Sequence, residues 1–140
     1  MNDPLYAKDV LRLAAAATGA GTLEPSDARG LARNPICGDK IDVTLKLDDA
    51  GRIEAMAHVT HACVLAQASA AILGAHLHGS DIETVRSLRA SVAAMLNGEP
   101  APPSPFADYG ALTGAADHRN RHTCVLLPID AVLDALQSGR

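Results

Sequence analysis

The sequence has few aromatic residues: they make up 2% of its 140 residues, and tryptophan is absent. Since 48% of the residues are hydrophobic all the same, alanine and the aliphatic side chains must fill the interior. We therefore expect a helix-rich core in which small side chains let the helices pack closely. A chain of this length can bury one sizeable core, so residues 1–140 are predicted to form a single domain.

The sequence also lacks long hydrophobic runs and runs of basic residues. No apolar stretch approaches the roughly 20 residues that a membrane-spanning helix needs, and residues 1–4 are acidic rather than basic. The formal net charge is -4, and no stripe of Lys and Arg could attract a phosphate backbone. We expect a cytoplasmic protein that binds neither membranes nor nucleic acids.

Cysteine is scarce, with three residues, Cys37, Cys63 and Cys124, far apart in the chain. An odd, scattered set is unsuited to a disulfide framework and lacks the close pairs of a zinc ribbon, so only the fold can bring these thiols together. The sequence contains no glycine motif for nucleotides, and no spacing singles out the Cys and His of a protease. Metal binding, sulfur chemistry and plain burial remain as uses of reduced cysteine.

Hydrophobic periodicity predicts a mixed α+β fold. Two alternating stretches, 40–47 and 52–60, flank the turn signal Asp-Asp-Ala-Gly and should pair as an antiparallel hairpin with one buried face. Residues 18–30 are rich in turn formers and predict a connection with room for a short strand. Helical spacing predicts helices over residues 4–17, 63–77, 82–96 and 107–116.

The last part of the chain is harder to assign, because Pro128 lies within its apolar pattern. Proline suits the first turn of a helix and is costly deeper inside, so the closing helix either begins near Cys124 or is kinked. A polar loop is expected over residues 117–120. Four prolines among residues 99–105 predict an extended surface segment.

The predicted hairpin brings two of the thiols together. Cys37 lies just before its first strand and Cys63 just after its second, so the two meet in space although the chain between them is long. Cys63 also begins a run of strong helix formers, and the free N–H groups and dipole of a helix N-terminus favour a thiolate.

Four side chains have the chemistry of a tetrahedral zinc site, in which thiolate sulfur and carboxylate oxygen are common ligands. They are Cys37, Asp39, Cys63 and Cys124. Gly38 would let the backbone turn tightly between the first two. Three thiolates and a carboxylate around a divalent cation leave a net charge of about -2, so nearby cations are expected. The candidates are Arg33, Lys40 and Arg121.

Simpler explanations exist for these residues. Free cysteine is among the most buried residue types and behaves as a small hydrophobe, although the polar, loop-forming neighbours of Cys37 hold it near the surface. Asp39 alone could be a loop cap or a surface charge. Of the six histidines, most are expected at or near the surface. Whether His61 or His122, each two residues before a cysteine, ligates a metal stays open.

Three short segments carry a family resemblance. They are Asn-Pro-Ile-Cys-Gly-Asp at residues 34–39, Cys-Val-Leu-Ala-Gln-Ala-Ser at 63–69 and Arg-His-Thr-Cys at 121–124. They resemble the signature regions of the U-type iron-sulfur cluster assembly proteins, a family that includes IscU, SufU and the N-terminal domain of NifU. The long separation of the second and third cysteines is more similar to SufU. The resemblance implies a small antiparallel three-stranded sheet with helices packed on one face.

The chain departs from the family pattern at several positions. Ala62 stands where glycine is usual before the second cysteine, and Thr123 stands where IscU has a histidine before the third. Residues 117–121 match the chaperone-recognition segment of IscU, Leu-Pro-Pro-Val-Lys, only in a final basic residue. The resemblance therefore supports neither a histidine ligand nor a partnership with that chaperone.

The resemblance implies an iron-sulfur cluster assembly protein that accepts persulfide sulfur from a SufS-like cysteine desulfurase. It would be mainly a cluster scaffold or sulfur carrier, or a zinc-dependent sulfurtransferase, with Zn2+ or a transient 2Fe-2S or 4Fe-4S cluster as cofactor. The implied ligands are Cys37, Asp39, Cys63 and Cys124. Cys37 is the first candidate for the sulfur-accepting thiol and Cys124 the second, with Arg121 as charge support.

Downstream cluster-assembly or acceptor proteins are the other expected partners, and the chain itself is expected to be a monomer or a weak dimer. Two alternatives remain open. One is a zinc-stabilised interaction module without sulfur transfer, and the other is a metal-free helical domain with buried cysteines.

Overall fold

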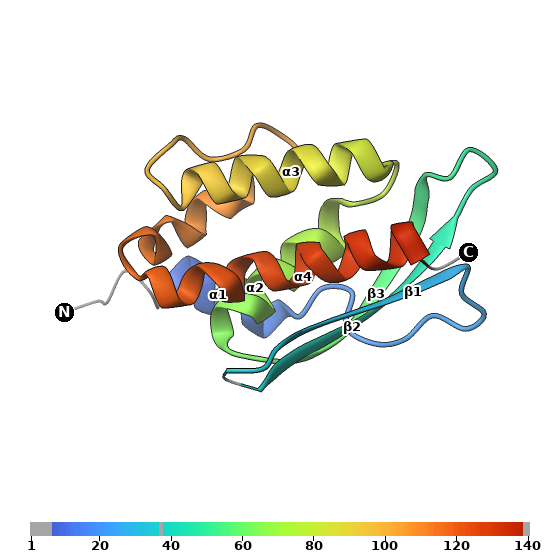
Figure 1. Cartoon of the computed structure of the whole chain (residues 1–140), viewed down its shortest axis with the longest axis horizontal. Helices are drawn as coiled ribbons and strands as arrows, with labels where there is room; N and C mark the ends of the chain where they lie inside the picture. The colour runs from blue at the N-terminus through green and yellow to red at the C-terminus, as the bar shows by residue number, and fades with distance from the viewer. Residues whose placement is uncertain (1–6, 37, 139–140) are drawn as a thin grey trace.

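The computed structural model describes residues 7–36 and 38–138. In chain order its elements are α1 (Lys8–Ala16), β1 (Ala28–Asn34), β2 (Asp39–Leu47), β3 (Ile53–His61), α2 (Val64–His76), α3 (Ile82–Met95), the 3-10 helix η2 (Ala107–Asp117) and α4 (Arg119–Ser138). The strands form one antiparallel sheet in the order β1-β2-β3, and the helices gather on one side of it (Figure 1). The predicted α+β fold is confirmed. In the described residues, no helix has the length and apolar character needed to cross a bilayer.

The hairpin between β2 and β3 follows from its turn sequence. Oδ1 of Asp48 accepts 2.9 Å hydrogen bonds from the backbone N–H groups of Ala50 and Arg52. Gly51 has a φ of 82°, a conformation that glycine adopts without strain. The predicted hairpin is confirmed to within one residue at each strand end.

The first strand is the element that the sequence located least well. β1 overlaps only the end of the connection predicted over residues 18–30 and runs on to Asn34. It pairs antiparallel with β2, so that Asn34 lies opposite Asp39. The segment between Asn34 and Asp39 therefore joins two paired strands and is not a loop before a strand pair. Cys37, within this segment, lies outside the described residues.

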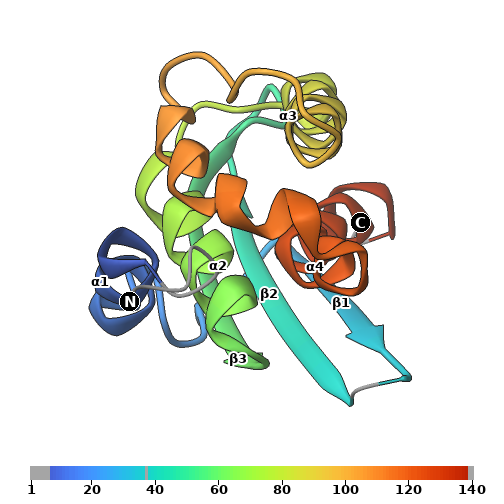
Figure 2. The same ribbon diagram turned by 90° about the vertical axis from the view of Figure 1, so that its left-hand side faces the viewer.

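Alternation along the strands gives the sheet one face that the helices cover. Ile41, Val43 and Leu45 of β2 point toward this face and have no exposed surface. α2 and α4 pack directly on it, α1 packs beside α2, and α3 packs beside α4 (Figures 1 and 2). We call this side of the sheet the covered face and the other side the open face.

α4 crosses β1 at very short range because β1 has a glycine at the crossing. A Cβ atom on Gly30 would lie 2.2 Å from the carbonyl oxygen of Ala131 and 2.4 Å from the backbone nitrogen of Ala135. Beside this contact, the carboxylate of Asp134 accepts a 2.9 Å hydrogen bond from the backbone N–H of Leu31 at the sheet edge. Together these contacts fix the position of α4 along the sheet.

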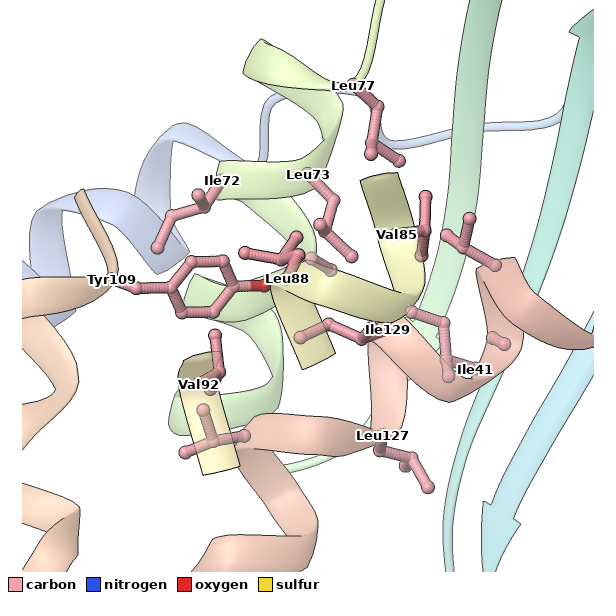
Figure 3. Packing of buried hydrophobic residues seen from close by; sticks show 14 of the residues in the cluster. Ile41, Ile72, Leu73, Leu77, Val85, Leu88, Val92, Tyr109, Leu127 and Ile129 are labelled. Atoms are coloured by element: carbon pink, nitrogen blue, oxygen red, sulfur yellow. The ribbon is translucent and has the colours of Figure 1, made fainter. Parts of the chain in front are cut away.

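One tyrosine joins three helices in the core. Tyr109 of η2 is fully buried (Figure 3). Its hydroxyl lies 2.7 Å from the hydroxyl of Ser69 in α2. Ser69 in turn donates a 2.8 Å hydrogen bond to the backbone carbonyl of Val125 in α4. Burial raises the pKa of Tyr109, so its hydroxyl stays protonated. The rest of the core is almost entirely aliphatic, as the composition predicts.

The predicted helix bounds are confirmed for α2, α3 and η2 to within about a residue, while α1 and α4 start elsewhere. α1 begins at Lys8, because the backbone of Ala7, with a ψ of 157°, is extended; residues 4–6 of the predicted helix lie outside the described residues. The proline-rich segment 99–105 contains no helix or strand and is mostly exposed, as predicted, although Pro102 is buried.

The start of α4 corrects two expectations. The helix begins at Arg119, so the polar stretch 117–120 is mostly the end of η2 and the exposed first turn of α4, and not a loop. The side chains of residues 117–120 are polar because they face solvent, and not because they form a loop. Of the two alternatives for the closing helix, a start near Cys124 is wrong, because Pro128 lies in the helix interior; a kink at Pro128 stays a prediction. Proline has no N–H, so one backbone donor is missing from the hydrogen bonds of α4 at position 128.

His58 is a buried histidine on β3 that joins the sheet to the end of α1. Its side chain donates from Nε2 to the carbonyl of Thr18 at 3.0 Å, which leaves Nδ1 to accept from the hydroxyl of Thr60 at 2.8 Å. Burial lowers the pKa of His58, so the folded protein holds the neutral ring.

Replacing Gly30 by alanine should destabilise the fold by about 3 kcal/mol, because the added Cβ overlaps the backbone of α4. Gly110→Ala in η2 is the matched control, since its Cβ would meet only the Cβ of Ala101 at an ordinary 3.5 Å. Urea unfolding of both variants measures the difference. Equal stability of the two would contradict the close crossing.

His58→Gln should destabilise the protein more at pH 7.5 than at pH 5.5. Because the folded-state pKa of His58 is lowered, its contribution is fully present above the unfolded-state pKa of about 6.5. That contribution is lost as the pH falls from there toward the folded-state pKa. Denaturant unfolding at the two pH values checks this, and a difference from wild type that is independent of pH would oppose it.

Candidate metal site

The pleat of β2 decides where the side chain of Asp39 points. Asp39 is the first residue of the strand and alternates in phase with Ile41 and Val43, so its half-buried carboxylate faces the helices. It lies at the end of the covered face that is next to the turn 35–38. At this end the sheet meets both α2 and α4.

Cys63 lies beside Asp39 because β3 ends at His61 and α2 begins at Val64. Cys63 is the N-cap of α2, and its backbone N–H donates a long, 3.5 Å hydrogen bond to Oδ2 of Asp39. The first N–H groups of a helix have no partner within it and carry the positive end of its dipole. The end of α2 therefore supplies positive potential where the carboxylate and the thiol lie.

Cys124 reaches the same carboxylate from the second turn of α4. Its side chain is buried, with 3% of the residue exposed, and its S–H donates to Oδ2 of Asp39 at an Sγ–O distance of 3.7 Å. Cys63 is half-buried. The site is thus open on the side of Cys63 and closed on the side of Cys124.

The three side chains fit one divalent metal ion. A ligand atom from each of Asp39, Cys63 and Cys124 lies within 4.8 Å of the other two. Zinc ligands at about 2.0–2.3 Å from the ion are about 3.4–3.8 Å from one another in a tetrahedron, so small side-chain movements suffice. No histidine of residues 7–36 and 38–138 joins this group.

The fourth predicted ligand, Cys37, lies outside the described residues, and its role stays a prediction. Its neighbours in the turn are exposed: Ile36 has 95% of its surface accessible, and Gly38 has a φ of 76°. The backbone N–H of Gly38 donates to the carbonyl of Asn34 at 2.8 Å and closes the turn. The described residues on either side of position 37 thus belong to a surface turn that adjoins Asp39 in the chain.

The remaining predicted residues lie around this group. Arg121 is half-buried in α4, one turn before Cys124, and its role as charge support stays a prediction. His122 uses Nε2 to donate to the carbonyl of Ala116 at 3.0 Å, which joins α4 to η2. His61 is exposed and lies opposite Lys40 in the sheet, so it points to the open face, away from Asp39.

Sequence reasoning missed the residues that position the ligands. Gly30 lets α4 approach the sheet, and Ser69 bonds α2 to α4 behind the site. A glycine within a strand and a lone hydroxyl within an apolar helix are the signals that could have revealed them. Neither signal indicates which helix contacts the residue.

The NifU-like N-terminal domain model matches residues 5–125, a stretch that includes all three cysteine segments. The chain belongs to the NifU-like N-terminal domain family. The resemblance to the U-type iron-sulfur cluster assembly scaffolds, stated from the motifs, is thereby confirmed.

Individual relatives agree with this family. The N-terminal part of a nitrogen-fixing NifU-like protein from Brucella abortus is 32% identical and superimposes with a TM-score of 0.90, covering 96% of this chain and 94% of that one. An iron-sulfur cluster assembly scaffold of the SUF system from Fervidobacterium islandicum has a TM-score of 0.83 over 98% of this chain and 100% of its own. At 18% identity it shares the fold alone.

A relative from Bacillus subtilis is named the zinc-dependent sulfurtransferase SufU. It is 33% identical over 95 residues, which make up 67% of this chain and 64% of the relative. The match thus spans somewhat less than two thirds of that protein's length.

Zinc titration of the reduced protein should show about one ion per chain. Asp39→Asn should weaken zinc binding at least about tenfold, because the neutral amide is a poorer ligand for the ion than a carboxylate. Asp42→Asn is the control, since Asp42 lies on the same strand but on the open face, bonded to Arg29. Equal affinity of the two variants, or no zinc binding by wild type, would exclude the site.

Proposed function

We propose that this protein is a zinc-dependent sulfur carrier of iron-sulfur cluster assembly. It accepts persulfide sulfur from a SufS-like cysteine desulfurase and passes it to a downstream acceptor. The observation that carries the proposal is the convergence of Asp39, Cys63 and Cys124 at the N-terminus of α2. The family match and the name of the SufU relative support the same chemistry.

Four side chains would hold the ion: the three that converge and Cys37 from the adjoining turn. A bound zinc ion would keep the cysteine sulfurs deprotonated and limit their reactivity until one is released. Asp39 is the harder, oxygen donor in a set otherwise made of sulfur. Its carboxylate already accepts from the backbone of Cys63 and from the thiol of Cys124, so it holds both neighbours in place.

Cys37 is the proposed sulfur acceptor because its neighbours in the turn are exposed, whereas Cys124 has 3% of its surface accessible. In the transfer step, the thiolate of Cys37 attacks the terminal sulfur of the donor's persulfide. A new S–S bond forms on Cys37, the donor's S–S bond breaks, and the donor cysteine leaves as a thiolate. No external oxidant or reductant is needed, since the persulfide sulfur is exchanged between two thiolates.

Arg121 has a supporting role in this proposal. The donor's persulfide and the cysteine thiolates are anionic, and the half-buried guanidinium one turn before Cys124 offsets part of their charge. The same reasoning led us to expect cations near three thiolates and a carboxylate that together carry more negative charge than a divalent ion offsets.

Cys37→Ala should remain folded and lose at least about 99% of the sulfur transferred from the desulfurase, because the attacking thiolate is gone. Mass spectrometry of the protein after incubation with desulfurase and cysteine measures the added sulfur atom. Cys124→Ala is the comparison for the second candidate. Transfer retained by Cys37→Ala and lost by Cys124→Ala would reverse the assignment of the acceptor.

The same variant separates the carrier from a zinc-stabilised interaction module. A module that uses the metal only to hold its loops should lose much of its thermal stability with Cys37→Ala, whereas a carrier should keep its fold. Metal analysis and visible absorption of protein purified without oxygen separate the carrier from the scaffold. Colourless zinc protein supports the carrier, and brown protein with iron and sulfide supports the scaffold.

A further inference from the structure

The open face of the sheet is covered at one end only. α1 lies on the side of β3, and β1 is the opposite edge of the sheet, so the segment between α1 and β1 must cross the open face. This segment runs toward the end of the sheet that carries the turn 48–51 (Figure 1). There the backbone N–H of Leu23 donates to the hydroxyl of Thr44 at 3.0 Å, and Thr44 is buried. The other end, next to the turn 35–38, carries no covering segment among the described residues.

The uncovered end presents two rows of side chains. Arg33, Lys40 and His61 lie opposite one another across the three strands and form the row nearest the turn. In the next row, Leu31, Asp42 and Val59 lie opposite one another. Leu31 is 44% exposed and Val59 is 37% exposed, while Asp42 between them is bonded to Arg29. With Ile36 in the turn, these residues form what we call the basic sheet end.

Among the described residues of the basic sheet end, the cations Arg33 and Lys40 outnumber the one acid, Asp42, which is hydrogen-bonded to Arg29 and also attracts Lys40 at longer range. Arg33 and Lys40 lie directly opposite each other, an arrangement of like charges that destabilises a sheet, and neither forms an ion pair with a described residue. Arg29, farther along β1, shows the contrast, since it donates two hydrogen bonds to Asp42 at 2.9 and 2.6 Å. Acidic groups from another molecule would offset the repulsion at Arg33 and Lys40.

The basic sheet end also adjoins the metal site. Lys40 follows Asp39 in the chain, and His61 precedes Cys63 by two residues. At the same strand ends, the candidate metal ligands therefore lie on the covered face and the cations on the open face. A hollow of about 500 Å³ opens here; its lining residues include Arg33, Lys40 and His61 as well as Asp39. Exposed apolar side chains beside unpaired cations are typical of a surface for another protein.

We propose that the basic sheet end docks an acidic surface of the cysteine desulfurase, beside the cysteine that carries its persulfide. The proposal rests on the sulfur-carrier function proposed above and names the surface that orients the donor. Acidic side chains of the donor pair with Arg33 and Lys40, and its apolar groups cover Leu31, Val59 and Ile36. The donor then sits against the turn from which sulfur is taken up.

The test measures binding of the zinc-loaded full chain to the host's SufS-like desulfurase by calorimetry at low and moderate salt. Lys40→Glu should weaken binding at least about tenfold and flatten its salt dependence, because a cation facing acidic groups becomes an anion. Lys46→Glu is the matched control. It makes the same charge change on the same strand and on the same open face, but at the end next to the turn 48–51. Its affinity for the desulfurase should stay within about twofold of wild type.

Each outcome decides between the two proposals. If wild type binds the desulfurase and accepts sulfur while Lys40→Glu and Lys46→Glu behave alike, the docking surface is wrong and the carrier function stands. If wild type neither binds nor accepts sulfur, both proposals fail. If the free chain dimerises and Lys40→Glu abolishes the dimer, the surface belongs to a second copy and the docking proposal is overturned. Circular dichroism and zinc content confirm that each variant is folded and loaded.

Discussion

The position of α4 on the sheet is the constraint on which the rest of the structure depends. Gly30 removes the side chain at the crossing, and Asp134 accepts from the edge of β1, so the helix lies at one depth and register. At this depth the buried thiol of Cys124 comes within 3.7 Å of Asp39. The hydrogen bond from Ser69 to the backbone of α4 holds α2 alongside, which keeps the N-terminus of α2 at the same carboxylate. Ligands from three elements therefore converge because of packing contacts away from them.

Strand alternation places two groups of side chains on opposite faces at one end of the sheet. Asp39 turns toward the helices and joins the cysteines, while Lys40, the next residue, turns to the open face. The candidate metal ligands are thus sheltered by α2 and α4, whereas the cations lie on the open face. The turn 35–38 lies at the junction of the two faces, where a donor bound on one face could reach a thiol that also serves the other. The geometry suits a carrier, because sulfur must enter from outside and still meet a protected site.

The sequence predicted the parts that depend on local pattern. Strand alternation and the Asp-Asp-Ala-Gly turn gave β2 and β3, and helical periodicity gave α2 and α3, because these signals need only near neighbours. The proposed ligand set came from motif chemistry; the structure brings Asp39, Cys63 and Cys124 together, while Cys37 lies outside the described residues. Polarity misled the prediction of α4, since its exposed first turn resembles a loop. The role of Gly30 could not be predicted either, because a glycine in a strand does not indicate which helix packs against it.

The most direct test of this account is X-ray absorption at the zinc edge of protein purified without oxygen. We predict one zinc ion with three sulfur neighbours at about 2.3 Å and one oxygen neighbour at about 2.0 Å. That shell requires the two described cysteines, Cys37 and Asp39 to meet at a single ion. A shell of nitrogen and oxygen alone, or protein that retains no zinc, would contradict it.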